Sequence, residues 1–296
     1  MRQHPHVIAI LGGLGAACLW AVSNITSSRS SRAIGATPTI AWVTFLGLLM
    51  TLPLLAASGP VPEIPTSTLL LLLGAGVSSV VGSYFFYRAL RIGKIGIVSA
   101  VTSTEGAVTA VIAVVAGEAL GLGSAVMLAV IAAGVAVVAF ASGDAEGGPG
   151  STRHVDPADA PRAIAYAGLC ALAFGVALYW TALVGIALPL AYAVLPVRLV
   201  GTVVVFIPLL VTRRLRLTRE ALPFVAATAL VEVLGTACYA LGARQSVAIT
   251  AVLSSQFAAV AAVAAFLIYR EHLTVRQRSG IIAIAAGVAI LAGIRA

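Results

Sequence analysis

Three ionisable side chains lie in the interior of long apolar segments of the sequence: Glu105, Arg198 and Glu232. An ionised group near the centre of a bilayer costs about 2.5–3.5 kcal/mol on insertion scales, so it needs a partner or water. Because three charges cannot pair off evenly, we expect at least one carboxyl to face water, carry a proton or meet a ligand. The alternative is a buried ion pair between Arg198 and one glutamate, which would join two helices and bind nothing.

The types of these groups suggest a role for each. A guanidinium makes two parallel hydrogen bonds to a carboxylate and stays protonated, so Arg198 is predicted to bind a solute carboxylate. Glu105 and Glu232 are assigned to a solute ammonium or to a coupled proton. The glutamate further from Arg198 is the better proton carrier, because a nearby cation stabilises the ionised carboxylate. The sequence does not say which glutamate that is.

Polar side chains recur at helical spacing around Glu232. Thr228, Glu232, Thr236 and Tyr239 follow a spacing that places them on one helix face. The positions 153 residues before the last three are Ser79, Ser83 and Phe86. We predict that Ser79, Ser83, Glu232, Thr236 and Tyr239 line a water-filled cavity between two related helices. In the alternative, the hydroxyl groups bond carbonyls of their own helix and support packing.

Three further residues are candidates for the same solute site. Trp20 and Asn24, four residues apart, could present an aromatic wall and an amide to a solute. Gln256 corresponds to Ser103 at the offset of 153, and its amide could serve a ligand or helix packing. Glu118 and Glu271 are predicted instead to cap helices or to meet arginines of the loops.

The composition places these residues in a membrane protein. Hydrophobic residues make up 60% of the 296-residue chain and charged residues 9%, while the mean hydropathy of the sequence is +1.08. These values exclude a water-soluble domain. The net charge of +8 comes from residues between apolar runs, so nucleic acid is not an expected partner. The three cysteines show no metal-ligand spacing, and we expect no metal or cofactor.

Ten apolar runs are long enough to cross about 30 Å of hydrocarbon as helices. The expected fold is therefore an all-α membrane protein with ten transmembrane helices. The runs cover residues 7–26, 37–57, 67–90, 96–116, 122–141, 162–183, 189–211, 221–243, 248–269 and 275–294. A polar, Gly/Pro-rich linker at 142–161 separates a first five-helix repeat (1–141) from a second (162–296).

The two halves are similar to each other at one fixed offset. The segment Ile131–Ala136 recurs as Ile284–Ala289, and Gly117–Glu118 aligns with Arg270–Glu271; both shifts equal 153 residues. An odd number of crossings in each half inverts the second repeat relative to the first. Inverted repeats of this kind build alternating-access carriers with a solute site near the middle of the membrane.

Basic residues gather at one set of connections. The loops after the odd-numbered helices carry fourteen of them, and the opposite side carries Arg2, Arg244 and Arg295. By the positive-inside rule, this distribution predicts that both termini face away from the cytoplasm.

Several of these features resemble the EamA family, the ten-helix branch of the drug/metabolite transporter superfamily that includes the YddG-like exporters. They are the duplicated five-helix unit, the run Leu19–Asn24, the segment Tyr87–Leu90 and the Gly117–Glu118 step. The resemblance implies a ten-helix inverted-repeat carrier, often an exporter of amino acids or related metabolites. It also implies termini in the cytoplasm, the opposite of the orientation that the basic residues favour.

The expected function is therefore export of amino acids or related small metabolites by alternating access. Proton-coupled export of cationic drug-like compounds and a channel or scramblase are the alternatives. The sequence has no HExxH or GxSxG motif and no aspartate in any expected span, so we do not expect an enzyme. The expected partners are a small-molecule solute, a coupled proton as an open alternative, and the lipid bilayer. We expect a multi-pass monomer or homodimer in the bacterial inner membrane.

Overall fold

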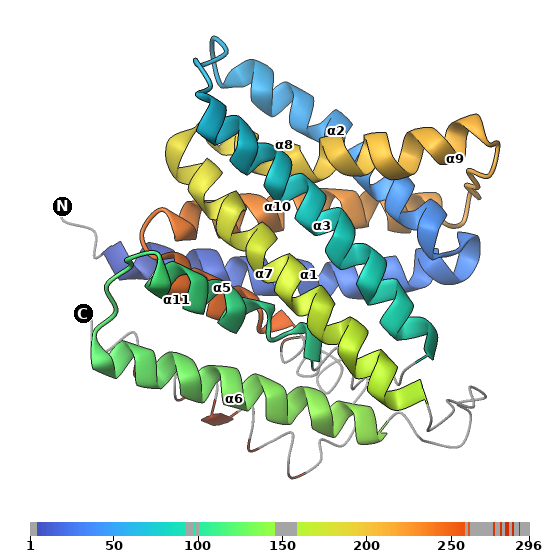
Figure 1. Cartoon of the computed structure of the whole chain (residues 1–296). Coiled ribbons are helices and arrows are strands. Elements are labelled where there is room, and N and C mark those ends of the chain that lie inside the picture. The colour runs from blue at the N-terminus through green and yellow to red at the C-terminus, as the bar shows by residue number, and fades with distance from the viewer. Residues whose placement is uncertain are drawn as a thin grey trace.

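The computed structural model describes residues 5–92, 98, 101–145 and 159–257, and single residues at 260, 275, 279, 282, 283, 286 and 290. Over these residues the regular structure is helical, and no strand occurs (Figure 1). The helices are α1 (Pro5–Ile34), α2 (Ala36–Ala57), α3 (Thr66–Ile92), α5 (Glu105–Val115), α6 (Leu122–Ala145), α7 (Ala160–Ala187), α8 (Leu190–Gly201), η2 (Thr202–Phe206), α9 (Ile207–Val211), α10 (Leu222–Ala243) and α11 (Val247–Ser254).

Among the described residues, six helices are long and apolar enough to cross a membrane. They are Val7–Ser31, Ala36–Ala57, Thr66–Phe86, Ala160–Ala187, Leu190–Val211 and Leu222–Ala243. The fifth of these is α8, η2 and α9 in direct succession. These six agree with the first, second, third, sixth, seventh and eighth runs of the sequence. The tenth expected run, 275–294, lies outside the described residues except for isolated positions.

The expected helix boundaries shift around the polar linker. α6 continues to Ala145 and α7 begins at Ala160, so the first and last residues of the expected 142–161 linker are helical. Residues 146–158 lie outside the described part of the chain.

Two of the expected continuous helices are wrong in one respect, because each is interrupted by a turn. The run 96–116 breaks at Ser103–Thr104, and the run 248–269 breaks at Ser255–Gln256. Clusters of hydroxyl groups explain both breaks, since such side chains compete with the helix for backbone carbonyls. The Thr104 hydroxyl donates to the Val101 carbonyl at 2.7 Å, and the Ser255 hydroxyl donates to the Val252 carbonyl at 2.9 Å.

The helices of the two halves pack against each other in matching pairs. α1 lies along α10 while α3 lies along α7, and α5 lies beside α11 while α2 lies beside α8 (Figure 1). Two glycines of corresponding position permit the close approach. A Cβ on Gly82 would lie 2.5 Å from the Phe174 ring, and a Cβ on Gly235 would lie 2.6 Å from the Trp20 indole nitrogen. Small residues at helix contacts are typical of membrane proteins, where close van der Waals packing drives association.

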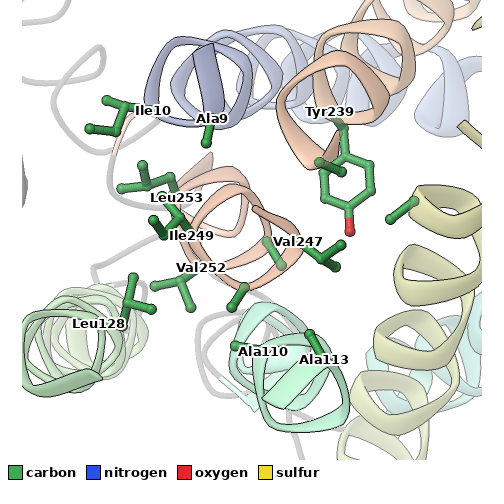
Figure 2. Close-up of a cluster of buried hydrophobic side chains, with 14 of the residues drawn as sticks. Ala9, Ile10, Ala110, Ala113, Leu128, Tyr239, Val247, Ile249, Val252 and Leu253 are labelled. Atoms are coloured by element: carbon green, nitrogen blue, oxygen red, sulfur yellow. The ribbon is translucent and has the colours of Figure 1, made fainter. Parts of the chain in front are cut away.

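The largest buried apolar cluster surrounds α11. Figure 2 shows Ile249, Val252 and Leu253 of this helix in the centre of the cluster. Side chains from five other helices complete the cluster, including Ala9 and Ile10 of α1, Ala110 and Ala113 of α5, Leu128 of α6, Ala182 of α7 and Tyr239 of α10. α11 is therefore an interior helix, which agrees with the complete burial of its eight residues.

The connections of the helices gather at two opposite ends. The ends of α1, α3 and α9 and the beginnings of α2, α7 and α10 lie on the right of Figure 1. Exposed arginines occupy this end, among them Arg29, Arg88, Arg162, Arg216 and Arg219. We call it the basic end. At the opposite end, Arg244 donates to the carbonyls of Gly185 and Leu188, at 2.7 Å and 3.1 Å, and so closes the turn between α7 and α8.

Candidate solute-binding site

An ion pair joins two helices in the interior of the bundle. Arg198 of α8 and Glu232 of α10 approach to 3.2 Å between Nη2 and Oε2, and the Arg198 side chain is only 3% exposed. The other oxygen of Glu232 accepts a hydrogen bond of 2.6 Å from Ser23 of α1. The pair therefore ties together three helices, two of which come from the second half of the sequence.

The surroundings of Arg198 depend on a glycine and on an irregular helix. A Cβ on Gly47 of α2 would lie 2.8 Å from the Arg198 Cδ, so a larger side chain there would displace the arginine. After Arg198 the helix widens into the π-helical segment η2. Pro208 follows that segment and lacks the N–H that a regular helix would pair one turn earlier. π-Helical segments recur at functional sites of membrane and soluble proteins.

Arg198 retains hydrogen-bonding capacity. Its Nε is buried and has no hydrogen-bond partner within the described part of the chain. Its side-chain hydrogen bond within the described part of the chain, to Glu232, uses one terminal nitrogen. Since a guanidinium carries five N–H donors in a planar fork, the pair with Glu232 leaves donors for a further acceptor.

Glu105 lies in a different position from Glu232. It begins α5 directly after the turn at Ser103–Thr104 and is 7% exposed. Among the described residues, no ion pair or hydrogen bond of its carboxyl group occurs, although it lies within electrostatic range of Glu232. The structure thus answers the question that the sequence left open: Glu232 is the partner of Arg198, and Glu105 is the more isolated carboxyl.

The two helix breaks bring unpaired oxygens into the interior. Thr102 Oγ1 and Gln256 Oε1 are buried and have no hydrogen-bond partner in the described part of the chain. Gln256 donates from its amide nitrogen to the carbonyl of Val252 at 3.0 Å. The breaks contact each other, because a Cβ on Gly106 would lie 2.4 Å from the Ala251 carbonyl oxygen and 2.6 Å from the Ser255 hydroxyl.

The predicted polar stripe is largely buried in this conformation. The hydroxyls of Ser83 and Thr236 donate to carbonyls of their own helices, at Ser79 and Glu232. Tyr239 is fully buried, and its hydroxyl donates to the Leu178 carbonyl of α7 at 3.0 Å. For Ser83 and Thr236 this is the bonding pattern of the packing alternative.

Not all of the predicted site residues lie together. Trp20 lies beside Tyr239, with ring centroids 6.1 Å apart, on the α1–α10 contact that also holds the ion pair. Ser79 and Ser83 lie on α3, which packs along α7 and α8, and no hydrogen bond joins them to the ion pair in the described part of the chain. The side chain of Asn24 lies outside the described residues.

Sequence reasoning missed the contribution of α1 hydroxyls to this site. Ser23 binds Glu232, and one turn further on the hydroxyls of Thr26 and Thr228 lie 2.7 Å apart. The signal is present in the sequence, because Ser23, Thr26 and Ser30 recur at helical spacing near the end of an apolar run.

Glu118 has the structural role that was predicted, on a different helix. Its carboxylate accepts from the Ser246 hydroxyl at 2.5 Å and from the Ala248 amide at 3.2 Å. It therefore caps the beginning of α11 rather than that of the helix following it in sequence. Glu271 lies outside the described residues.

Long apolar helices around a buried ion pair define an integral, multi-pass helical membrane protein with a polar interior. Residues 7–140 match the model of the EamA-like transporter family, which confirms the resemblance seen in the sequence. This family belongs to the drug/metabolite transporter superfamily and indicates a membrane transporter of small solutes.

A solved structure supports the fold over nearly the whole chain. A crystal structure whose title names no function is similar with a TM-score of 0.76, over 97% of this chain and 98% of its own. The two sequences are 16% identical, so this likeness concerns the fold alone. No curated protein matches the chain.

Proposed function

We propose that this protein is an alternating-access carrier that exports amino acids or related small metabolites. The observation that carries the proposal is the buried ion pair between Arg198 and Glu232. A zwitterionic solute contains the same two charges as this pair. When the solute carboxylate binds Arg198 and its ammonium binds Glu232, each buried charge exchanges one partner for another, and none is left unpaired.

This exchange favours a zwitterion over a lipophilic cation. A cation that bound Glu232 alone would leave Arg198 buried without a counter-ion, and an uncompensated buried charge costs about 3–5 kcal/mol. The free Nε of Arg198 supports the carboxylate role, because a solute carboxylate could accept from it while Glu232 turned toward the ammonium. Export of cationic drug-like compounds is the second candidate, and it would depend on Glu105 and Glu232.

The reciprocal packing of the halves supports the inverted-repeat architecture with ten helices. Several contacting pairs have a counterpart in which the halves exchange roles: α1 with α10 and α7 with α3, or α1 with α11 and α7 with α5. The turns at Ser103–Thr104 and Ser255–Gln256 fall at corresponding places in both halves. Interrupted helices at the interface of two repeats are typical of secondary transporters, where they surround the solute and ion sites.

A cavity at the less basic end is lined in part by α8, the helix that carries Arg198. Its volume is about 230 Å³, and it is lined by Leu54, Ala57, Ser58, Leu190, Ala191, Val194 and Ala237. Val194 precedes Arg198 by one helical turn, and both are buried residues of α8. A solute entering or leaving at this end would therefore pass along α8 to reach the guanidinium.

Glu105 is proposed as the proton-coupling group. It is almost completely buried and has no cationic partner among the described residues, so it can hold or release a proton without breaking the Arg198–Glu232 pair. The predicted location is the bacterial inner membrane, where a proton gradient is available to drive export. A monomer or homodimer is the proposed assembly.

The test is reconstitution of the purified protein in liposomes. Labelled zwitterionic amino acids and labelled lipophilic cations are offered separately, with and without a pH gradient, and empty liposomes give the background. We expect saturable uptake of amino acids, which distinguishes a carrier from a channel whose flux rises nearly linearly with concentration. Saturable uptake of cations alone would favour the second candidate, and non-saturating flux would favour a channel or scramblase.

A further inference from the structure

A second polar cavity lies at the basic end, between the last turns of α3 and the first turns of α7. Its volume is about 300 Å³, and it is lined by Arg88, Ile92, Asp159, Arg162 and Tyr166. None of these residues belongs to the candidate solute site. Both halves of the chain line the cavity, since α3 precedes the polar linker and α7 follows it.

The charges that line this cavity sum to a positive value. Arg88 and Arg162 contribute two guanidinium groups, and Asp159 contributes one carboxylate. The distance from Arg162 Nη1 to Asp159 Oδ1 is long, at 3.6 Å, and the Arg162 side chain is exposed. The ion pair with Asp159 therefore holds Arg162 only weakly. Within the described part of the chain, Arg88 has no carboxylate partner.

An aromatic side chain orients one of the two basic groups. Arg88 donates from Nε to the Tyr84 hydroxyl at 3.1 Å, and its guanidinium lies 5.3 Å from the centre of the Tyr84 ring. This contact leaves the two terminal nitrogens of Arg88 available. Tyr166 lines the cavity while its ring lies against Phe85, with centroids 6.1 Å apart. The fork of Arg88 is thus held in place before any anion binds, which lowers the entropic cost of binding.

We propose that this cavity binds the phosphodiester headgroup of an anionic phospholipid. Guanidinium groups bind phosphate oxygens through paired, charge-assisted hydrogen bonds, and one net positive charge matches a phosphodiester monoanion. The cavity lies at the ends of two membrane-crossing helices, where the phosphates of a bilayer also lie. Basic pockets between helices at such ends are a recurring form of lipid recognition.

The outer surfaces of the same helices favour a lipid over a free phosphate ester. Large apolar side chains of α3 and α7 are exposed, including Leu73, Val77, Val81, Leu169 and Leu172. Acyl chains can lie against this surface while the headgroup occupies the cavity. A bound lipid would then connect the end of α3 to the beginning of α7.

The experiment compares lipids on delipidated protein in a neutral detergent. Phosphatidylglycerol is titrated against phosphatidylcholine, and binding is followed by native mass spectrometry. We expect selective retention of phosphatidylglycerol by the wild type. The double variant Arg88→Gln/Arg162→Gln should lose about tenfold or more of this affinity, since each basic residue near a lipid surface contributes on the order of 1 kcal/mol. The matched control Arg216→Gln/Arg219→Gln removes two exposed arginines of the same end outside the cavity.

Three results would overturn the proposal. The first is equal retention of the two lipids by the wild type, and the second is an equal loss in the control and in the cavity variant. The third is full competition by glycerol phosphate at the concentration of the lipid, which would assign the cavity to a free phosphate ester. If the glutamine variant does not give a single peak in size-exclusion chromatography, Arg88→Lys/Arg162→Lys replaces it. This variant keeps the charges, and we expect it to bind phosphatidylglycerol more weakly than the wild type because the guanidinium fork is lost.

Discussion

Replacing the two interior glutamates one at a time should separate folding from transport. Glu232→Gln should lower the stability of the protein, whereas Glu105→Gln should leave the stability unchanged and remove the response of transport to a pH gradient. In Glu232→Gln, Arg198 loses its only charged partner in the described structure, whereas Glu105→Gln removes a carboxyl that has no such partner. Glutamine keeps the size of the side chain and an oxygen that accepts hydrogen bonds. The comparison therefore isolates the charge.

The expected cost differs because the contacts differ. Removing one member of a buried ion pair costs about 3–5 kcal/mol, and a hydrogen bond to a charged group contributes about 1.5–3 kcal/mol. The Glu232 side chain is 30% exposed, and glutamine can still accept from Ser23, so the lower range applies. We expect Glu232→Gln to destabilise the protein by about 2–3 kcal/mol, which corresponds to a fall of about 3–5 °C in the thermal midpoint.

Glu105→Gln should leave the thermal midpoint within about 1 °C of the wild type, since its carboxyl bonds no described residue and a neutral amide is not harder to bury. Its transport should no longer respond to a pH gradient, because an amide cannot exchange a proton. Glu220→Gln, at an exposed position of the basic end, is the matched control and should change neither property.

Two assays are needed on the same preparations: thermal unfolding in detergent and amino-acid uptake by liposomes. The reasoning about the ion pair is refuted if Glu232→Gln has the same thermal midpoint as the wild type. The reasoning about proton coupling is refuted if Glu105→Gln folds normally and retains uptake driven by a pH gradient.

Three further changes test the site, the orientation and the helix breaks. Arg198→Lys should keep the charge but lose the planar fork, so we expect the affinity for amino acids to fall roughly tenfold to thirtyfold, about 1.5–2 kcal/mol, in equilibrium binding; unchanged affinity would exclude the carboxylate role. If the basic end faces the cytoplasm, the C-terminus lies on the opposite side, so a C-terminal alkaline phosphatase fusion should be active and a fluorescent protein fusion should be dark. Strong cytoplasmic fluorescence would instead place the terminus in the cytoplasm. Gly106→Ala should cost about 1–3 kcal/mol because its Cβ would meet a backbone oxygen at 2.4 Å, whereas Gly168→Ala has open space and should be neutral or stabilising in the same unfolding assay.

The long helices could be predicted from the sequence because the apolar runs alone determine them. Hydropathy averaged over about 20 residues is insensitive to a two-residue turn, so the breaks at Ser103–Thr104 and Ser255–Gln256 could not be seen that way. The consecutive hydroxyl residues at both places are a local signal that hydropathy ignores.

The candidate site could be predicted only in part. Burial of a charge is visible in one segment, so Arg198, Glu105 and Glu232 stand out from their surroundings in the sequence. The choice of partner depends on how helices far apart in the chain are arranged, and this is why Glu232 rather than Glu105 could not be assigned to Arg198. Ser23 was missed for the same reason, since its partner Glu232 follows it by 209 residues.

The packing of first-half helices against second-half helices has a consequence for synthesis of the protein. Ser23 of α1 cannot form its hydrogen bond until Glu232, 209 residues later, has been made. The carbonyl of Ala9 likewise accepts from Thr250, which follows it by 241 residues. At about 5–20 residues per second, the ribosome needs on the order of 10–40 s to make α10 after α1 has entered the membrane. During that interval the surface of α1 that packs against α10 faces lipid or the insertion machinery, and the surface of α3 stays uncovered until α7 is made. A chain released early would expose these surfaces, so nascent chains that end before α10 should be preferred substrates of membrane quality-control proteases.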